Sequence, residues 1–175
     1  TPLMSEVAAH VLVVDDDPDV ALLVRMLLER RGGCTVDVAE DGETALELAT
    51  ARLPDVVVTD IEMPGISGLE LIEQLRVRAR DVPVVVMTAH VSVEYAVSAL
   101  RAQADEFLTK PLDNARLAEV VQRLAVEGRR RREHARRQEI VLPVGAHPAD
   151  AEIGVGGVLS PHSAAGADAA DRAAP

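Results

Sequence analysis

The strongest constraint on the fold is a regular alternation of short apolar runs with longer amphipathic stretches. The runs are rich in valine and too short for helices, which favours strands; they cover residues 11–14, 35–39, 55–60, 84–88 and 106–110. The stretches between them place apolar residues at helical spacing; they cover residues 20–31, 42–52, 69–80, 93–103 and the segment after Asp113. Five strands alternating with five helices predict a doubly wound α/β fold, with a parallel sheet covered by helices on both faces.

Several predicted helices have recognisable ends. Asp17 or Asp19 can cap the first helix, and Asp113 can cap the last. Gly32 and Gly33 are expected to end the first helix, because glycine is the preferred residue just past a helix terminus.

Polar residues stand where the predicted strands end. Asp15 and Asp16 follow the first strand, Asp60 ends the third, Thr88 ends the fourth and Lys110 ends the fifth. The carboxyl ends of parallel strands meet at one edge of a sheet, which is also where ligands bind in such folds. We therefore expect these five side chains to lie in one pocket.

Three carboxylates in one pocket repel one another, and a divalent cation among them relieves this repulsion. Oxygen ligands suit a hard ion, so the expected cofactor is Mg²⁺, with Mn²⁺ able to replace it in vitro. A carboxylate can also attack phosphorus and form an aspartyl phosphate. Lys110 and Thr88 could then neutralise and hold the transferred group.

Four segments resemble the receiver domain of two-component response regulators. They are Val13-Val14-Asp15-Asp16-Asp17-Pro18, Thr59-Asp60-Ile61-Glu62-Met63-Pro64-Gly65, Met87-Thr88-Ala89-His90 and Leu108-Thr109-Lys110-Pro111. The resemblance covers about residues 9–126 and implies a flavodoxin-like (βα)5 fold with strand order 2-1-3-4-5.

The resemblance also implies a role for each residue of the pocket. Asp60 would be the phosphoacceptor. Asp15, Asp16, Asp60 and the backbone carbonyl of Glu62 would hold Mg²⁺, and Lys110 would pair with the phosphate. A cis peptide before the proline that follows Lys110 is usual in the family.

The same resemblance implies a switch and its partners. A histidine kinase or phosphotransfer protein would supply the phosphoryl group, Thr88 would move inward, and Phe107 would fill the vacated space. The face formed by the fourth helix, fifth strand and fifth helix would then contact an output partner or form a homodimer. The protein would not be an enzyme, beyond catalysing its own phosphorylation and dephosphorylation.

A phosphatase of the haloacid-dehalogenase type is the alternative enzyme class, because it uses an aspartyl phosphate, Mg²⁺, a threonine and a lysine. Those enzymes place the nucleophile on the first motif strand, with a second aspartate two residues later. Here the acidic pair Asp15 and Asp16 comes before Asp60, and Glu62 stands two residues after it. This order disfavours the phosphatase.

The chain outside the resemblance has a different composition. Residues 1–8 are expected to form a disordered lead, and residues 127–139 a basic helical extension or linker. This extension holds six arginines: Arg129, Arg130, Arg131, Arg132, Arg136 and Arg137. No DNA-binding domain is recognised, the net charge is −11, and Tyr95 and Phe107 are the only aromatic residues, all of which disfavour nucleic-acid binding.

Residues 140–175 resemble the opening of zinc-dependent N-acetylglucosaminyl deacetylases. His147 and Asp150 match two zinc ligands of that family, but Ala149 replaces its usual general base. We expect an incomplete, disordered fragment, so the chain could be the receiver part of a truncated fusion to such an enzyme.

The sequence also indicates a compartment. Cys34 is the single cysteine, so no intrachain disulfide can form, which fits a reducing environment. No apolar run approaches the roughly 18 residues of a membrane span. We expect a cytoplasmic protein with no membrane contact.

Overall fold

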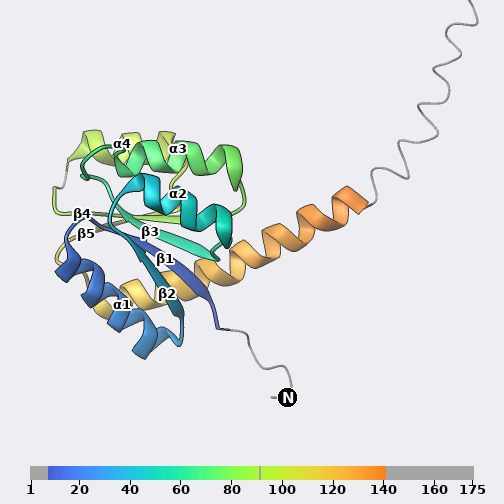
Figure 1. Cartoon of the computed structure of the whole chain (residues 1–175), viewed down its shortest axis with the longest axis horizontal. Helices are drawn as coiled ribbons and strands as arrows, with labels where there is room; N and C mark the ends of the chain where they lie inside the picture. Colours follow the sequence, from blue (N-terminus) through green and yellow to red (C-terminus); the bar gives the residue numbers. More distant parts are fainter. Residues whose placement is uncertain (1–7, 91, 141–175) are drawn as a thin grey trace, which may run out of the picture. The chain divides into compact units, whose positions relative to one another are not determined.

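The structure, a computed structural model, describes residues 8–90 and 92–140, in which strands and helices alternate (Figure 1). The strands are β1 (His10–Val14), β2 (Thr35–Ala39), β3 (Val56–Asp60), β4 (Val84–Thr88) and β5 (Glu106–Thr109). The first four helices are α1 (Pro18–Gly32), α2 (Gly42–Ala51), α3 (Gly68–Arg78) and α4 (Val93–Arg101). A further helix, here called the C-terminal helix, covers residues 114–140.

The five strands form one parallel sheet in the order β2-β1-β3-β4-β5. Every residue of β1, β3 and β4 is buried, whereas the edge strands β2 and β5 are partly exposed. This explains why the central strands are nearly continuous apolar runs. The predicted fold class and strand order are confirmed.

Helices cover both faces of the sheet (Figure 1). Side chains alternate between the faces along each strand. Val11 and Val13 of β1 therefore pack with α1 and the C-terminal helix, while Leu12 and Val14 pack with α2 and α3. Two separate apolar cores hold the sheet between these layers.

The predicted helix caps are present. Asp17 caps α1, and its carboxylate accepts a hydrogen bond of 2.9 Å from the backbone N–H of Asp19. Gly33 follows α1 in the left-handed conformation, with φ of 59°. Asp113 caps the C-terminal helix, accepting bonds of 3.0 and 3.2 Å from the next turn.

Several elements end earlier than the pattern predicts. Helix α3 ends at Arg78, before a non-helical residue at position 79. Helix α4 ends at Arg101, and Gln103 adopts a positive φ of 69°. Strand β5 ends at Thr109, one residue before Lys110.

The beginning of the predicted basic linker contacts the sheet. Arg129 and Arg132 pair with Asp55, and Arg131 pairs with Asp105. The sequence predicts a domain that ends at residue 126, but these contacts reach six residues further. We therefore propose that the domain extends to about Arg132, which is also the last residue of the first of the chain's two compact units.

The predicted lead over residues 1–8 and the predicted deacetylase-like fragment over residues 140–175 lie outside the described residues, apart from Ala8 and Ile140, and so do His147 and Asp150. Within residues 8–90 and 92–140, no helix has the length and apolar character needed to cross a membrane.

Candidate functional site

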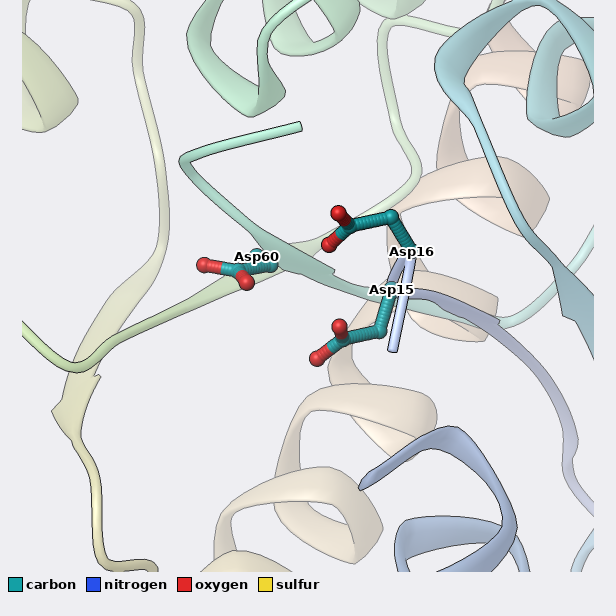
Figure 2. Close-up of side chains that lie close together, drawn as sticks. All are labelled: Asp15, Asp16 and Asp60. Carbon is teal, nitrogen blue, oxygen red and sulfur yellow. The ribbon is translucent and has the colours of Figure 1, made fainter. Parts of the chain in front are cut away.

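Three carboxylates meet where β1 and β3 end (Figure 2). Strand β1 pairs with β3 in a register that sets Val14 opposite Thr59. The next residue along each strand is an aspartate, Asp15 after β1 and Asp60 at the end of β3, so this register brings the two side by side. With Asp16, each offers one oxygen within 4.8 Å of the others.

The three carboxylates differ in their surroundings. Asp15 is fully buried, Asp60 is 9% exposed and Asp16 faces solvent. Burial raises the pKa of Asp15 above its usual value, although the N–H of Asp17 and the charge of Lys110 act in the opposite direction. Such an oxygen-only set, costly to hold without a countercharge, fits a hard divalent cation such as Mg²⁺.

Lys110 supplies the positive charge that the structure shows at this site. Its Nζ lies 3.0 Å from Oδ2 of Asp15 and 3.2 Å from Oδ2 of Asp60. Burial acts to lower the pKa of Lys110, but its bonds to the two carboxylates outweigh burial and raise that pKa. The ammonium therefore stays charged, and the peptide bond from Lys110 to Pro111 is cis, as the resemblance implies.

The turn that follows β3 requires glycine at position 68, a requirement that the sequence patterns do not reveal. A Cβ atom at Gly68 would lie 2.0 Å from the carbonyl oxygen of Asp60. The N–H of Gly68 also donates a 2.9 Å bond to the carbonyl of Ile61. The start of α3 therefore packs closely against the main chain of Asp60, the proposed phosphoacceptor.

Among the described contacts, neither of the two predicted switch residues bonds to the carboxylates. Thr88 is fully buried, and its hydroxyl accepts a 3.0 Å bond from the N–H of His90 and donates a 3.2 Å bond to the same residue's carbonyl. Phe107 is half-buried against the core formed with α2 and α3. Their role as a switch pair stays a prediction.

Glu62 makes contacts that the sequence reasoning missed. Its backbone N–H donates a 3.4 Å bond to Oδ1 of Asp60, which places its main chain beside the carboxylates. Its side chain accepts a 2.7 Å bond from the hydroxyl of Tyr95 and lies 3.3 Å from Nε2 of His90. This hydrogen bond and the charge of Glu62 raise the pKa of Tyr95.

Several known proteins are similar to this chain in sequence. PrrA of Mycobacterium tuberculosis, a transcriptional regulatory protein, is 44% identical over 137 residues, which cover 78% of this chain and 57% of PrrA. The DNA-binding transcriptional regulator NtrC of Escherichia coli is 40% identical over 116 residues, covering 65% of this chain and 24% of NtrC. The chain therefore spans little more than half the length of PrrA and a quarter of NtrC.

Solved structures agree with this similarity. Chemotaxis protein CheY4 of Vibrio cholerae superposes with a TM-score of 0.64 at 29% identity, covering 67% of this chain and 99% of CheY4. NtrX of Brucella abortus gives a TM-score of 0.68 at 34% identity, covering 74% of this chain and 30% of NtrX. Residues 11–122 match the response regulator receiver domain, and the chain belongs to this family of two-component signalling domains.

Proposed function

We propose that this chain accepts a phosphoryl group on Asp60 from a histidine kinase or phosphotransfer protein, in the presence of Mg²⁺. The observation that carries the proposal is the meeting of Asp15, Asp16 and Asp60 within 4.8 Å, with Lys110 bound to two of them. Asp15, Asp16, Asp60 and the backbone carbonyl of Glu62 would hold the cation. When bound, Mg²⁺ would neutralise charge on the phosphoryl oxygens.

Asp60 is better placed as the nucleophile than the other two aspartates. Both oxygens of Asp15 are engaged, one by the N–H of Asp17 and the other by Lys110. Asp16 is exposed and cannot exclude water. In Asp60, Oδ2 faces Lys110, while Oδ1 accepts only a long bond of 3.4 Å from Glu62 among the described contacts. We therefore assign the attack on phosphorus to Oδ1.

The residues around Asp60 then have distinct tasks. Oδ1 forms a bond to phosphorus while the phosphorus–nitrogen bond of the donor phosphohistidine breaks. Lys110, already between Asp15 and Asp60, would transfer one of its hydrogen bonds to a phosphoryl oxygen. This positioning makes the domain a phosphoacceptor, with at most self-catalysed gain and loss of the group.

The response to phosphorylation would run through Thr88 and Phe107. The Thr88 hydroxyl would exchange its bonds to His90 for one to the phosphoryl group, and Phe107 would move into the vacated space. Helix α4 supports an output role, since Val93 and Leu100 are 79% and 73% exposed. An output partner or a second copy of the chain would bind the face of α4, β5 and the C-terminal helix.

We place this phosphoryl transfer in the cytoplasm, where free thiols persist, because the single cysteine, Cys34, is a buried free thiol.

Incubation with acetyl phosphate and Mg²⁺ tests the proposed function, with intact-protein mass spectrometry as the measurement. The protein should gain one phosphoryl group, and chelation of the cation should prevent the gain. Asp60→Asn should abolish it, whereas Asp81→Asn, which removes an aspartate outside the pocket, should not. Phosphorylation that persists in Asp60→Asn would contradict the assignment.

A further inference from the structure

A second network of contacts links the phosphorylation site to α4. One carboxylate, that of Glu62, is held by two side chains: the hydroxyl of Tyr95 lies 2.7 Å from Oε1, and Nε2 of His90 lies 3.3 Å from Oε2. We call these three residues the Glu62 clasp. Tyr95 belongs to α4, His90 follows β4, and Glu62 follows β3. The clasp therefore joins three neighbouring segments above the carboxyl edge of the sheet.

Tyr95 makes the stronger of the two contacts. Its ring is partly buried against the core formed with α2 and α3, and its N–H donates a 3.1 Å bond to the cap residue Ser92, while its hydroxyl bond to Glu62 is exposed to solvent. A hydroxyl bond to a carboxylate is charge-assisted. His90 and Glu62 have side chains that are 65% and 48% exposed, and such surface pairs contribute little.

Glu62 also contacts the proposed cation site through its main chain. The N–H of Glu62 points to Oδ1 of Asp60 at 3.4 Å, and the carbonyl of Glu62 is the proposed fourth cation ligand. Holding the Glu62 side chain restricts the rotation of this peptide segment. A ligand that is fixed before the cation arrives binds it with a smaller loss of entropy.

We propose that Tyr95 is a positioning residue for the cation site, holding the Glu62 main chain toward Asp60 through the Glu62 side chain. This inference rests on the proposed function, because it assumes that the site binds Mg²⁺. Coupling between two sites is reciprocal. Cation binding should therefore alter the hydrogen bond between Tyr95 and Glu62. It should change the environment of the first turn of α4 independently of Thr88 and Phe107.

The composition of the chain provides a direct probe. Tyr95 is the only tyrosine and there is no tryptophan, so tyrosine emission reports this residue alone. Hydrogen bonding of a phenol to a carboxylate quenches its emission. Titration of the full chain with Mg²⁺ should change the emission over the same concentrations at which calorimetry records binding. Glu62→Ala should increase the emission without cation and remove most of the Mg²⁺-dependent change.

A double-mutant cycle, in which calorimetry measures Mg²⁺ binding to each variant, tests the positioning role of Tyr95. Tyr95→Phe keeps the ring and removes the hydroxyl, and it should weaken Mg²⁺ binding by about fivefold, the effect of one hydrogen bond. Glu62→Ala should weaken binding by a similar factor, and the double variant no further, because both remove the same contact. The matched control, Glu94→Gln, removes a charge from the same turn of α4 and should leave the affinity unchanged.

Two different failures can be told apart. If the unmodified chain binds Mg²⁺ and takes a phosphoryl group, but Tyr95→Phe binds Mg²⁺ equally well and Tyr95 emission does not respond, the positioning role is overturned while the proposed function stands. If the unmodified chain neither binds Mg²⁺ nor takes a phosphoryl group, the proposed function fails and this inference fails with it. Thermal melts of each variant establish that it is folded.

Discussion

At the scale of single residues, the site depends on how closely main-chain and side-chain atoms approach. Asp15 and Asp60 lie together because β1 and β3 are in register, and Lys110 reaches both from the end of β5. Gly68, the first residue of α3, packs closely against the main chain of Asp60 and donates a hydrogen bond to the carbonyl of Ile61. The position of Asp60 is therefore set from the sheet on one side and from α3 on the other.

Gly68→Ala should disturb this arrangement. An added Cβ would lie 2.0 Å from the carbonyl of Asp60, so the turn or the end of β3 must shift. We expect a loss of about 2 kcal/mol in the free energy of unfolding, typical of overpacking, although alanine favours helices. Urea denaturation measures this loss, and phosphorylation by acetyl phosphate should slow. Glu73→Ala, on the exposed side of α3, should change stability by less than about 0.5 kcal/mol. A Gly68→Ala protein as stable as the parent would contradict the account.

The carboxylates and lysine of the site could be predicted from the sequence, whereas Gly68 and Tyr95 could not. Parallel strands bring their carboxyl ends to one edge, so polar residues at those ends must meet. The requirement at Gly68 and the contact of Tyr95 with Glu62 depend on loop geometry, which no periodic pattern encodes. The one available signal was that Tyr95 is the only tyrosine of the chain.

At the scale of elements, the C-terminal helix is fastened to the amino-terminal edge of the sheet by ion pairs. Asp55 accepts bonds from the N–H of His10 at 2.8 Å, from Arg129 at 3.0 Å and from Arg132. Gly128 lets the helix approach closely, since a Cβ there would lie 2.6 Å from Pro83. The helix is therefore part of the domain at least as far as Arg132.

The ion pairs of Asp55 predict a pH dependence of stability. Burial acts to raise the pKa of Asp55, but bonds from Arg129, the N–H of His10 and Arg132 outweigh it and lower that pKa. Because the pKa of Asp55 is lower in the folded than in the unfolded state, its ion pairs contribute fully to the free energy of unfolding above the unfolded pKa of about 3.9. This contribution is lost as the pH falls through the folded pKa. Asp55→Asn should thus be less stable by about 2 kcal/mol at pH 7, and the difference should vanish in strong acid.

Urea denaturation at a series of pH values measures this dependence. Arg132→Gln should show part of the same loss at pH 7, whereas Arg130→Gln, an exposed arginine of the same helix, serves as the matched control and should show little. A difference between Asp55→Asn and the parent that persists unchanged in strong acid would contradict the assigned pKa shift.

The number and type of elements could be predicted, but the role of the basic segment could not. Valine-rich runs and helical spacing identify the strands and helices because burial on two faces leaves a strong pattern. An arginine run looks the same whether it is solvated or paired. Its partners, Asp55 and Asp105, lie more than 20 residues away in sequence, and only the tertiary fold brings them to the helix.

At the scale of the whole molecule, the contacts predict where the chain can be cut. A chain that ends at residue 139 keeps Arg129, Arg131 and Arg132, so it should fold and accept phosphate like the full chain. A chain that ends at residue 126 loses all three and should be clearly less stable. Thermal melting and phosphorylation by acetyl phosphate compare the two. Equal stability of both shortened chains would show that the ion pairs do not stabilise the domain.

The central claim is that Asp60 carries the phosphoryl group. Borohydride reduction of the phosphorylated chain converts an aspartyl phosphate to homoserine, and peptide mass spectrometry locates the converted residue. The account predicts conversion at Asp60 alone, dependent on Mg²⁺ and on the phosphoryl donor. Conversion at Asp15 or Asp16, or none at Asp60 in a chain that has gained phosphate, would contradict it.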